Sequence, residues 1–369
     1  MSAGTSRRDF LGATGATVAL GLGGACSAGR ANRRGSILGT GRFLTVDTGK
    51  VTHLLCVFDL DRGRSRAIQM DFFGHGLVFH PTDRYRVVVF EKKGPGACEI
   101  DLRPGGATRP ITTPPERAFY GHGAFSRDGQ VLFATENHLQ TRNGLIAIRD
   151  AKTHRPLGEF PTYGQSPHDC NLIDDGKTLV ITNGGGPEGS EALPSVTFVD
   201  VATTKLLERL TFTNPRINAG HLALSAKRDL VAISAPREGL SRAALGGVTI
   251  RTGSGPFETV ASPQEVIDRM VGESLSLCID ERRRVVAVTN PDGNIVTVWD
   301  LDGKRLVKHL DLPLPRGLAR TADGGSVALS YGQGTLVLLD PETLNPAPTP
   351  VAASSALSGS HIFSWDPSA

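Results

Sequence analysis

One short pattern recurs along the chain at nearly constant spacing, and it restricts the fold more than any other feature. A short alternating segment is followed at a fixed offset by an apolar segment, as in Gly220–Ser225 with Leu230–Ile233, Ser276–Ile279 with Val285–Val288, and Gly317–Arg320 with Ser326–Leu329. Such segments, bounded by turn residues, are typical of β-strands. Repeats of roughly 40 to 55 residues with four strands each are the signature of propeller blades.

Composition agrees with an all-β protein and argues against one class of partner. The 369 residues include 44 glycines and 23 prolines, so turns are frequent, and long amphipathic helical patterns are nearly absent. The formal net charge of +3 is small, and basic and aromatic residues do not cluster. We therefore expect no nucleic-acid partner.

Counting repeats gives seven blades. Six complete units begin near His75, His122, His168, His221, Ser276 and Gly317. The two ends supply a seventh, with Ser360–Asp366 as its first strand and Arg42–Val46, Thr52–Leu60 and Ser65–Met70 as the other three. Such closure removes exposed sheet edges. We predict one all-β, seven-bladed β-propeller over residues 35–369, closed by pairing of N- and C-terminal strands, with a helix-like insertion at Ser262–Val271.

Residues 1–34 are predicted to be a twin-arginine (Tat) signal peptide and linker. Ser6–Leu11 has the form of the twin-arginine motif, and the weakly hydrophobic stretch Leu11–Gly24 is too short and glycine-rich for a permanent anchor. We therefore expect a periplasmic protein. Leu22–Cys26 resembles a lipoprotein signal, so a lipid on Cys26 would be its one membrane attachment, although we favour ordinary cleavage nearby.

The opening position of the first strand carries the main chemical prediction. It holds histidine in five blades, namely His75, His122, His168, His221 and His361, with Ser276 and Gly317 in the other two. The first strand of a blade lines the propeller axis, so these imidazoles are expected to converge at one mouth of the channel. Imidazole is a common ligand of zinc, copper, iron and nickel. The alternative is that each histidine makes a structural hydrogen bond within its own blade.

Other candidate positions are less specific. Loops on the same face would line the pocket with Glu136, Asn137, His138, Asn183 and Asn290, together with Ser276 and Arg316. The chain has no Gly-x-Ser-x-Gly elbow to supply a nucleophile, so its catalytic residues, if any, are unknown. Cys56, Cys98, Cys170 and Cys278 form no Cys-x-x-Cys pair, and we expect them to be buried small hydrophobes.

These features together resemble one bacterial family. The twin-arginine leader, the repeated Gly-His-Gly openings, Pro167–Cys170 and Ser360–Phe363 are similar to the domain of unknown function 1513. Because members are commonly encoded beside imelysin-type and di-heme oxidoreductase-like proteins in iron-uptake clusters, the resemblance implies periplasmic iron handling. It transfers no catalytic residues. The blades also resemble lactonase-type and Tyr-Val-Thr-Asn propellers, which concerns the fold only.

Three functions stay open at this point. The first is a metal-binding accessory protein of iron or copper handling, with the five histidines as ligands and periplasmic iron-uptake proteins as partners. The second is an enzyme in the same funnel, either a lactonase-like hydrolase or a metal-dependent oxidoreductase. The third is a protein-interaction platform. A monomer is expected in each case.

Overall fold

The computed structural model describes residues 33–45, 49–353 and 355–367. The predicted signal peptide, with Cys26, lies outside the described residues. Within the described part of the chain, no helix is long and apolar enough to cross a membrane.

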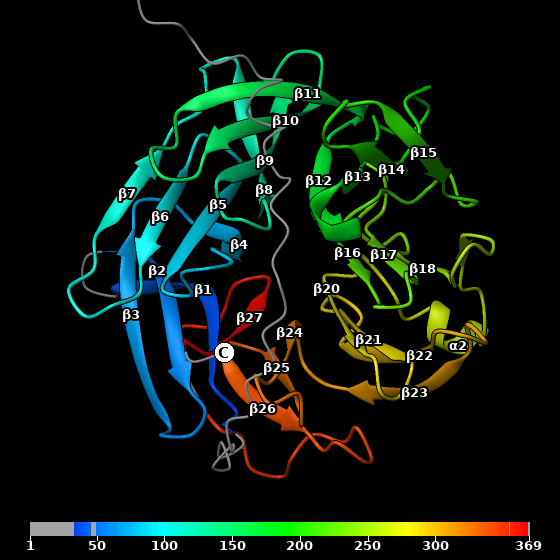
Figure 1. Cartoon of the computed structure of the whole chain (residues 1–369). Coiled ribbons are helices and arrows are strands. Elements are labelled where there is room, and N and C mark those ends of the chain that lie inside the picture. The colour runs from blue at the N-terminus through cyan, green and yellow to red at the C-terminus, as the bar shows by residue number, and fades with distance from the viewer. Residues whose placement is uncertain (1–32, 46–48, 354, 368–369) are drawn as a thin grey trace, which may run out of the picture.

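Antiparallel sheets surround a central axis as the blades of a propeller (Figure 1). Blade 1 contains β4 (Gly74–Phe79), β5 (Arg86–Gly94), β6 (Ala97–Asp101) and β7 (Thr108–Ile111). Blade 2 contains β8 (Arg117–Phe125), β9 (Val131–His138), β10 (Asn143–Asp150) and β11 (Pro156–Gln165). Blade 3 contains β12 (Pro167–Ile173), β13 (Thr178–Asn183), β14 (Ser195–Asp200) and β15 (Leu206–Thr211), with the short 3-10 helix η1 (Asp174–Gly176).

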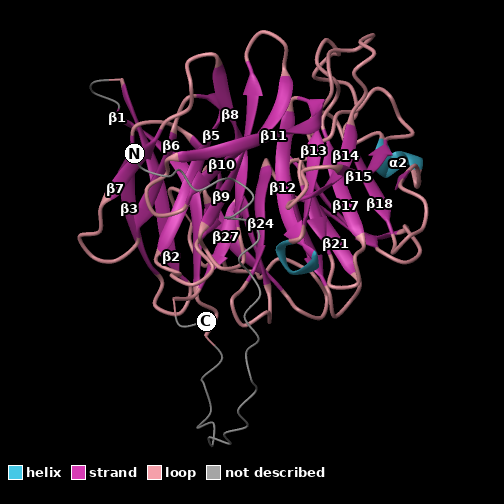
Figure 2. Cartoon of the chain, turned by 45° about the horizontal axis from the view of Figure 1, so that its top comes forward, coloured by secondary structure: helices cyan, strands magenta, loops and turns pink. Residues whose placement is uncertain are grey.

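The remaining blades follow the same order from the axis outwards. Blade 4 contains β16 (Leu222–Leu224), β17 (Leu230–Ser234), β18 (Gly247–Arg251) and β19 (Glu258–Thr259). Blade 5 contains β20 (Ser276–Asp280), β21 (Val285–Asn290), β22 (Ile295–Asp300) and β23 (Leu306–Asp311). Blade 6 contains β24 (Pro315–Arg320), β25 (Val327–Tyr331) and β26 (Thr335–Leu339). The tilted view shows strands running between the two faces of the disc, with loops on both (Figure 2).

The two ends of the chain complete blade 7, as predicted. The C-terminal strand β27 (Ile362–Trp365) pairs with β1 (Ser36–Thr45), which is followed by β2 (Lys50–Asp59) and β3 (Arg64–Met70). The register opposes Ser36 to Trp365 and Gly39 to Ile362. The C-terminus therefore supplies the innermost strand, and the seven-bladed fold closed by the two termini is confirmed.

Two departures from a regular blade have local causes. In blade 6, residues 345–352 run beside β26 through isolated bridges, since three prolines in this segment lack the N–H that a fourth strand would need. The predicted helix over 262–271 is short: α2 spans Gln264–Ile267, and Val266 and Met270 are its buried anchors.

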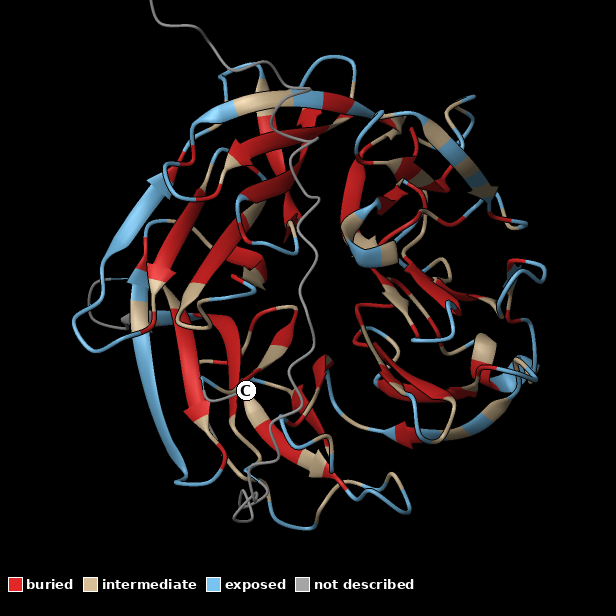
Figure 3. Cartoon of the chain, viewed as in Figure 1, coloured by how far each residue is buried: buried red, intermediate tan, exposed pale blue. Residues whose placement is uncertain are grey.

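Burial follows the strand order, as Figure 3 shows. Every residue of β17 and β21 is buried, while the outer strand β15 alternates between half-buried and exposed side chains. Apolar side chains of adjacent blades form joint clusters, such as Val285 and Val298 of blade 5 with Leu318 and Leu329 of blade 6. The blades therefore hold one another in place mainly by hydrophobic packing between sheets.

We predict that Trp365 stabilises the closing blade. Its ring packs in a cluster shared by blades 7 and 1, lies 5.6 Å from the Tyr85 ring, and donates from Nε1 to the Arg84 carbonyl at 2.6 Å. Trp365→Ala should lower the free energy of unfolding by about 3 to 5 kcal/mol. Trp365→Phe should lose only about 1 kcal/mol, since it removes one hydrogen bond and keeps most of the packing.

Urea denaturation measures both changes. The control is Leu207→Ala on the exposed face of β15, where the side chain is 59% exposed and the expected change is within about 0.5 kcal/mol. A Trp365→Ala variant as stable as this control would contradict the closure role.

Candidate metal centre

Hydroxyl side chains on the second strands define which first-strand positions are equivalent. Thr182 Oγ1 accepts the backbone N–H of Asp169 at 2.9 Å and donates to the Gly220 carbonyl of the next blade at 2.5 Å. Three more blades carry a matching hydroxyl. Thr135 accepts the backbone N–H of His122, Thr289 accepts that of Ser276, and Ser330 accepts that of Gly317. Each such bond marks the same first-strand position, here called the ring position.

The ring position differs from the sequence expectation in one blade. Strand pairing puts His75, His221 and His361 at the ring position of their blades, beside His122. In blade 3 the residue there is Asp169, and His168 lies one residue earlier. The register of β12 is shifted between Pro167 and Cys170. The sequence carries a signal for Asp169, because 13 residues separate it from Thr182, as they separate His122 from Thr135 and Ser276 from Thr289.

Four imidazoles meet on the axis. His75, His122, His221 and His361 are 3 to 9% exposed, and one ligand nitrogen from each lies within 4.8 Å of the others. The rings of His221 and His361 are 4.1 Å apart between centroids. Residues 75 and 361 lie far apart in the sequence, so this contact depends on propeller closure. The group could hold a metal ion.

His168 joins this group from the neighbouring position. Its Nε2 lies 3.3 Å from Nε2 of His75 and 3.1 Å from Nε2 of His221. Imidazole nitrogens bound about 2.1 Å from one ion stand roughly 3 to 3.4 Å apart in tetrahedral or octahedral arrangements. The spacing in this protein therefore suits shared coordination. The structure brings all five predicted histidines together, and we call them the histidine cluster.

Asp169 supports the cluster from behind. Its Oδ1 lies 3.4 Å from Nδ1 of His122 and its Oδ2 lies 3.9 Å from Nδ1 of His221. The two oxygens also accept the backbone N–H groups of Cys170 and Leu222 at 2.8 and 3.1 Å, which fixes the carboxylate. A carboxylate behind a ligating imidazole orients the ring and raises its basicity. Sequence reasoning missed this role of Asp169.

Two ring nitrogens have no partner. Nε2 of His122 and Nε2 of His361 are buried without a hydrogen bond to any described residue. Since Nδ1 of His122 faces Asp169, its Nε2 is the atom left for a ligand. A buried polar atom without a partner costs about 1 to 3 kcal/mol. The donor set therefore fits a bound cation better than a closed network of hydrogen bonds.

Two glycines make room for the rings. A Cβ at Gly76 would lie 2.6 Å from Nδ1 of His122, and a Cβ at Gly121 would lie 2.5 Å from Cδ2 of His75. Gly121 also has φ +110°, which side chains rarely adopt. The recurring Gly-His-Gly motif is thus explained by contact between blades 1 and 2, where each motif's glycine accommodates the other's imidazole.

Burial keeps the cluster uncharged. Desolvation lowers the pKa of His75, His168, His221 and His361 well below the ordinary value, and nearby positive charge of Lys92 adds to this effect. Burial also lowers the pKa of His122, although Asp169 opposes the shift. Neutral imidazole is the form that binds metals, so the cluster is ready to bind at neutral pH.

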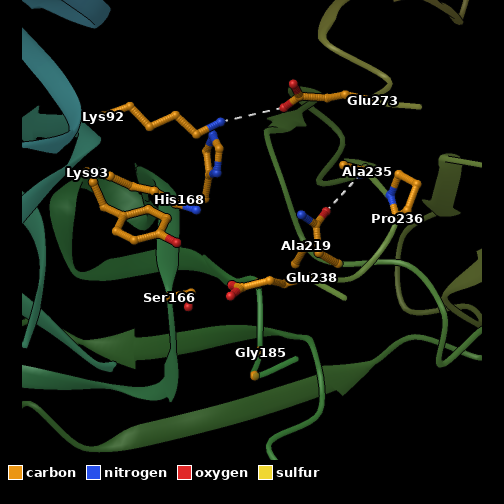
Figure 4. A pocket seen from close by; sticks show the side chains of 14 residues that line it. Lys92, Lys93, Ser166, His168, Gly185, Ala219, Ala235, Pro236, Glu238 and Glu273 are labelled. Atoms are coloured by element: carbon orange, nitrogen blue, oxygen red, sulfur yellow. Dashed lines mark hydrogen bonds and ion pairs between the residues drawn. The ribbon is translucent and has the colours of Figure 1, made fainter. Parts of the chain in front are cut away.

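The cluster divides the channel into two chambers. One is a cavity of about 280 Å³, here called the vestibule, which is lined by His168 with Lys92, Lys93, Ser166, Glu238 and Glu273 among others (Figure 4). The other is a chamber of about 550 Å³, whose lining includes His122, His221, His361, Asp169, Cys170 and Ser276. A bound ion would therefore lie between two solvent-accessible spaces.

The other residues expected at the pocket lie in different places. Ser276 occupies the ring position of blade 5 and lines the larger chamber. Glu136 is fully buried and forms an ion pair with Arg149 at 2.7 Å. Asn183 and Asn290 are buried, and their amide groups donate to Thr197 Oγ1 on β14 and to the Glu273 carbonyl respectively.

Three more of these positions bring no further ligand. Asn137 is buried at the end of β9, and His138 is half-buried beside it. Arg316 is half-buried next to the ring position of blade 6 and donates from Nε to the Gly359 carbonyl at 2.8 Å.

The four cysteines in the described part of the chain are free thiols. Cys56, Cys98 and Cys170 are buried and Cys278 is half-buried. Desolvation raises the pKa of Cys98 and Cys278 to about 12, so these thiols stay protonated and behave as small hydrophobes.

Fold and site together define a class of protein, a seven-bladed β-propeller whose axis is closed by buried histidines. The chain belongs to the family described as protein of unknown function (DUF1513), whose model matches residues 68–363. No curated protein sequence matches it.

Solved structures are similar in fold alone. The hydrazine synthase of Kuenenia stuttgartiensis aligns with TM-score 0.62 and 13% identity, covering 79% of this chain and 92% of that chain. The Cps50 (Swd1) β-propeller domain of Myceliophteria thermophila aligns with TM-score 0.51 and 13% identity, covering 69% and 80%. At such identity only the propeller architecture carries over.

We predict that acid destabilises the metal-free protein through the cluster. The pKa of each histidine is lower in the folded than in the unfolded chain, so below about pH 6.5 the unfolded chain binds protons that the fold excludes. Stability should fall from pH 7 to 5.5, by up to about 1.4 kcal/mol per pH unit for each histidine. Burial raises the pKa of Asp169, so this one carboxyl group has the opposite effect and favours the folded chain as the pH falls.

Urea denaturation at both pH values tests the prediction. Most carboxylates stay ionised in this range because their ordinary pKa values lie near 4. The exposed His309 on β23 gives the control His309→Gln, which should keep the full pH dependence. Equal stability at pH 7 and 5.5 would show that the cluster takes up protons without unfolding.

Proposed function

We propose that this protein is a periplasmic metal-binding propeller that serves as an accessory protein in iron or copper handling. The observation that carries the proposal is the convergence of five buried, neutral imidazoles, two of which have an unpartnered Nε2 atom. The two buried nitrogens without a hydrogen bond are unfavourable until they bind a cation.

The donor set supports a transition metal. Nitrogen ligands suit iron, copper, nickel and zinc, whereas calcium and magnesium require oxygen ligands. The Cys170 thiol lines the larger chamber, but burial raises its pKa, so thiolate ligation is disfavoured. Within this group of metals, the gene neighbourhood that the family implies favours iron. The high affinity of copper for imidazole ligands favours copper.

A sequence motif supports the proposed periplasmic location. Ser6–Leu11 carries the twin-arginine motif, and proteins exported by this route cross the membrane already folded. A metal site assembled from both ends of the chain requires folding before the metal can bind. Periplasmic iron-uptake proteins are the partners that such an accessory protein would serve.

A second candidate is a metal-dependent oxidoreductase. One specific feature favours it: the chamber of about 550 Å³ reaches three of the histidines, which leaves space for a small substrate beside the ion. In that case the histidines would hold the metal and the chamber would admit the substrate. A lactonase-like hydrolase or a docking platform has no comparable support.

We predict that the protein exported through its native leader carries about one transition-metal ion per chain. The double variant His122→Ala, His361→Ala should lose most of it, because it removes the two unpartnered nitrogens. The matched control His309→Ala changes an exposed histidine on β23 and should keep the wild-type metal content.

Elemental analysis after gel filtration measures the ratio, and circular dichroism verifies that the double variant is folded. Wild-type protein without stoichiometric metal, or a folded double variant that keeps all of it, would refute the proposal. Oxygen-dependent turnover by the loaded wild-type protein alone would favour the oxidoreductase.

A further inference from the structure

The vestibule has a charge that the metal proposal does not explain. Lys92 and Lys93 come from the end of β5, which extends beyond its own blade and pairs with β8 at Lys92 opposite Tyr120 and Gly94 opposite Phe119. This pairing places both lysines and Tyr120 at the same cavity. Lys93 is exposed, and its Nζ lies 5.7 Å from the Tyr120 ring centroid.

Two lysines and two glutamates line the vestibule, and one of the glutamates is neutralised by an arginine outside the lining. Glu238 accepts two hydrogen bonds from Arg142, at 2.6 and 2.9 Å, so its charge is already matched. Glu273 lies 3.6 Å from Lys92 Nζ and also interacts with Arg316. With Arg142 paired to Glu238 and Lys92 to Glu273, Lys93 is the lining cation that has no ion pair among the described residues, an excess of one positive charge.

Neutral donors complete the cavity. Tyr120 and Ser166 are 7 and 8% exposed, and both line the vestibule. Neither hydroxyl bonds to another residue in the part of the chain that the structure describes. Neither oxygen is among the buried atoms without a partner, so both hydroxyls are open to the cavity and can donate to a ligand that enters it. Figure 4 shows Lys92, Lys93, Ser166 and His168 around the same space.

We propose that the vestibule binds a small multivalent oxyanion, a carboxylate or a phosphate, held by Lys92 and Lys93 with Tyr120 and Ser166 as donors. Excess positive charge and hydroxyl donors in a partly desolvated cavity favour an anion and disfavour a free cation. The inference goes beyond metal binding and rests on residues other than the histidine ligands. His168 lines the vestibule, so the anion would lie next to a metal ion and partly neutralise its charge.

Calorimetric titration of wild-type protein with malonate, citrate and phosphate in low-salt buffer tests this proposal. Binding of one anion per chain is expected, with a preference among the three that identifies organic acid or inorganic phosphate as the ligand. Lys93→Gln should weaken binding roughly tenfold or more, because it removes a charged donor. Tyr120→Phe should weaken binding a few-fold, and the exposed control Lys205→Gln should change nothing.

Titrating both metal-free and metal-loaded protein separates this proposal from the metal proposal. Lys93→Gln should keep the wild-type metal content, since Lys93 is not a ligand. Anion binding by a protein that takes up no metal would support the vestibule site and refute the metal site. Absence of binding in both states at millimolar anion, or equal affinity in Lys93→Gln and wild type, would overturn the anion proposal.

Discussion

The desolvation of imidazoles at the propeller axis is the constraint on which the account of this protein depends. Five histidines are buried together, and their nearest polar side chains are one another and Asp169. Their burial is stabilised by apolar clusters between the blades, which supply the free energy that buried polar groups cost. A buried polar centre of this kind is expected where it binds a ligand, and a cation shared by the imidazoles is the simplest ligand.

Closure of the ring makes the centre possible. His361 reaches the axis because β27 completes blade 7, and the Thr182 hydroxyl connects the first strand of blade 3 to blade 4. The histidine cluster is thus a product of tertiary structure. The same connections bring Lys92 to the edge of the vestibule through the extended strand β5, so the metal centre and the charged chamber depend on one scaffold.

The sequence predicted the fold well because hydrophobic periodicity and turn residues repeat in every blade. The split seventh blade was predictable because Ser360–Asp366 resembles a first strand and the N-terminal segments resemble the later ones. Asp169 was missed because the blades were aligned on their histidines, although the spacing of 13 residues to Thr182, shared with the hydroxyls of blades 2, 5 and 6, selects Asp169. Lys92 and Tyr120 were missed because their proximity results from pairing between two blades, which blade-by-blade reasoning cannot detect. The loop residues expected at the pocket, such as Asn183, instead satisfy their own blades.

X-ray absorption spectroscopy at the edge of the bound metal tests the central claim most directly. With the histidine cluster as the site, the first shell contains four to five nitrogen scatterers, at about 2.0 to 2.2 Å, with the outer-shell pattern of imidazole rings. A first shell of sulfur, or of oxygen without imidazole scattering, would contradict the claim that these five side chains hold the ion.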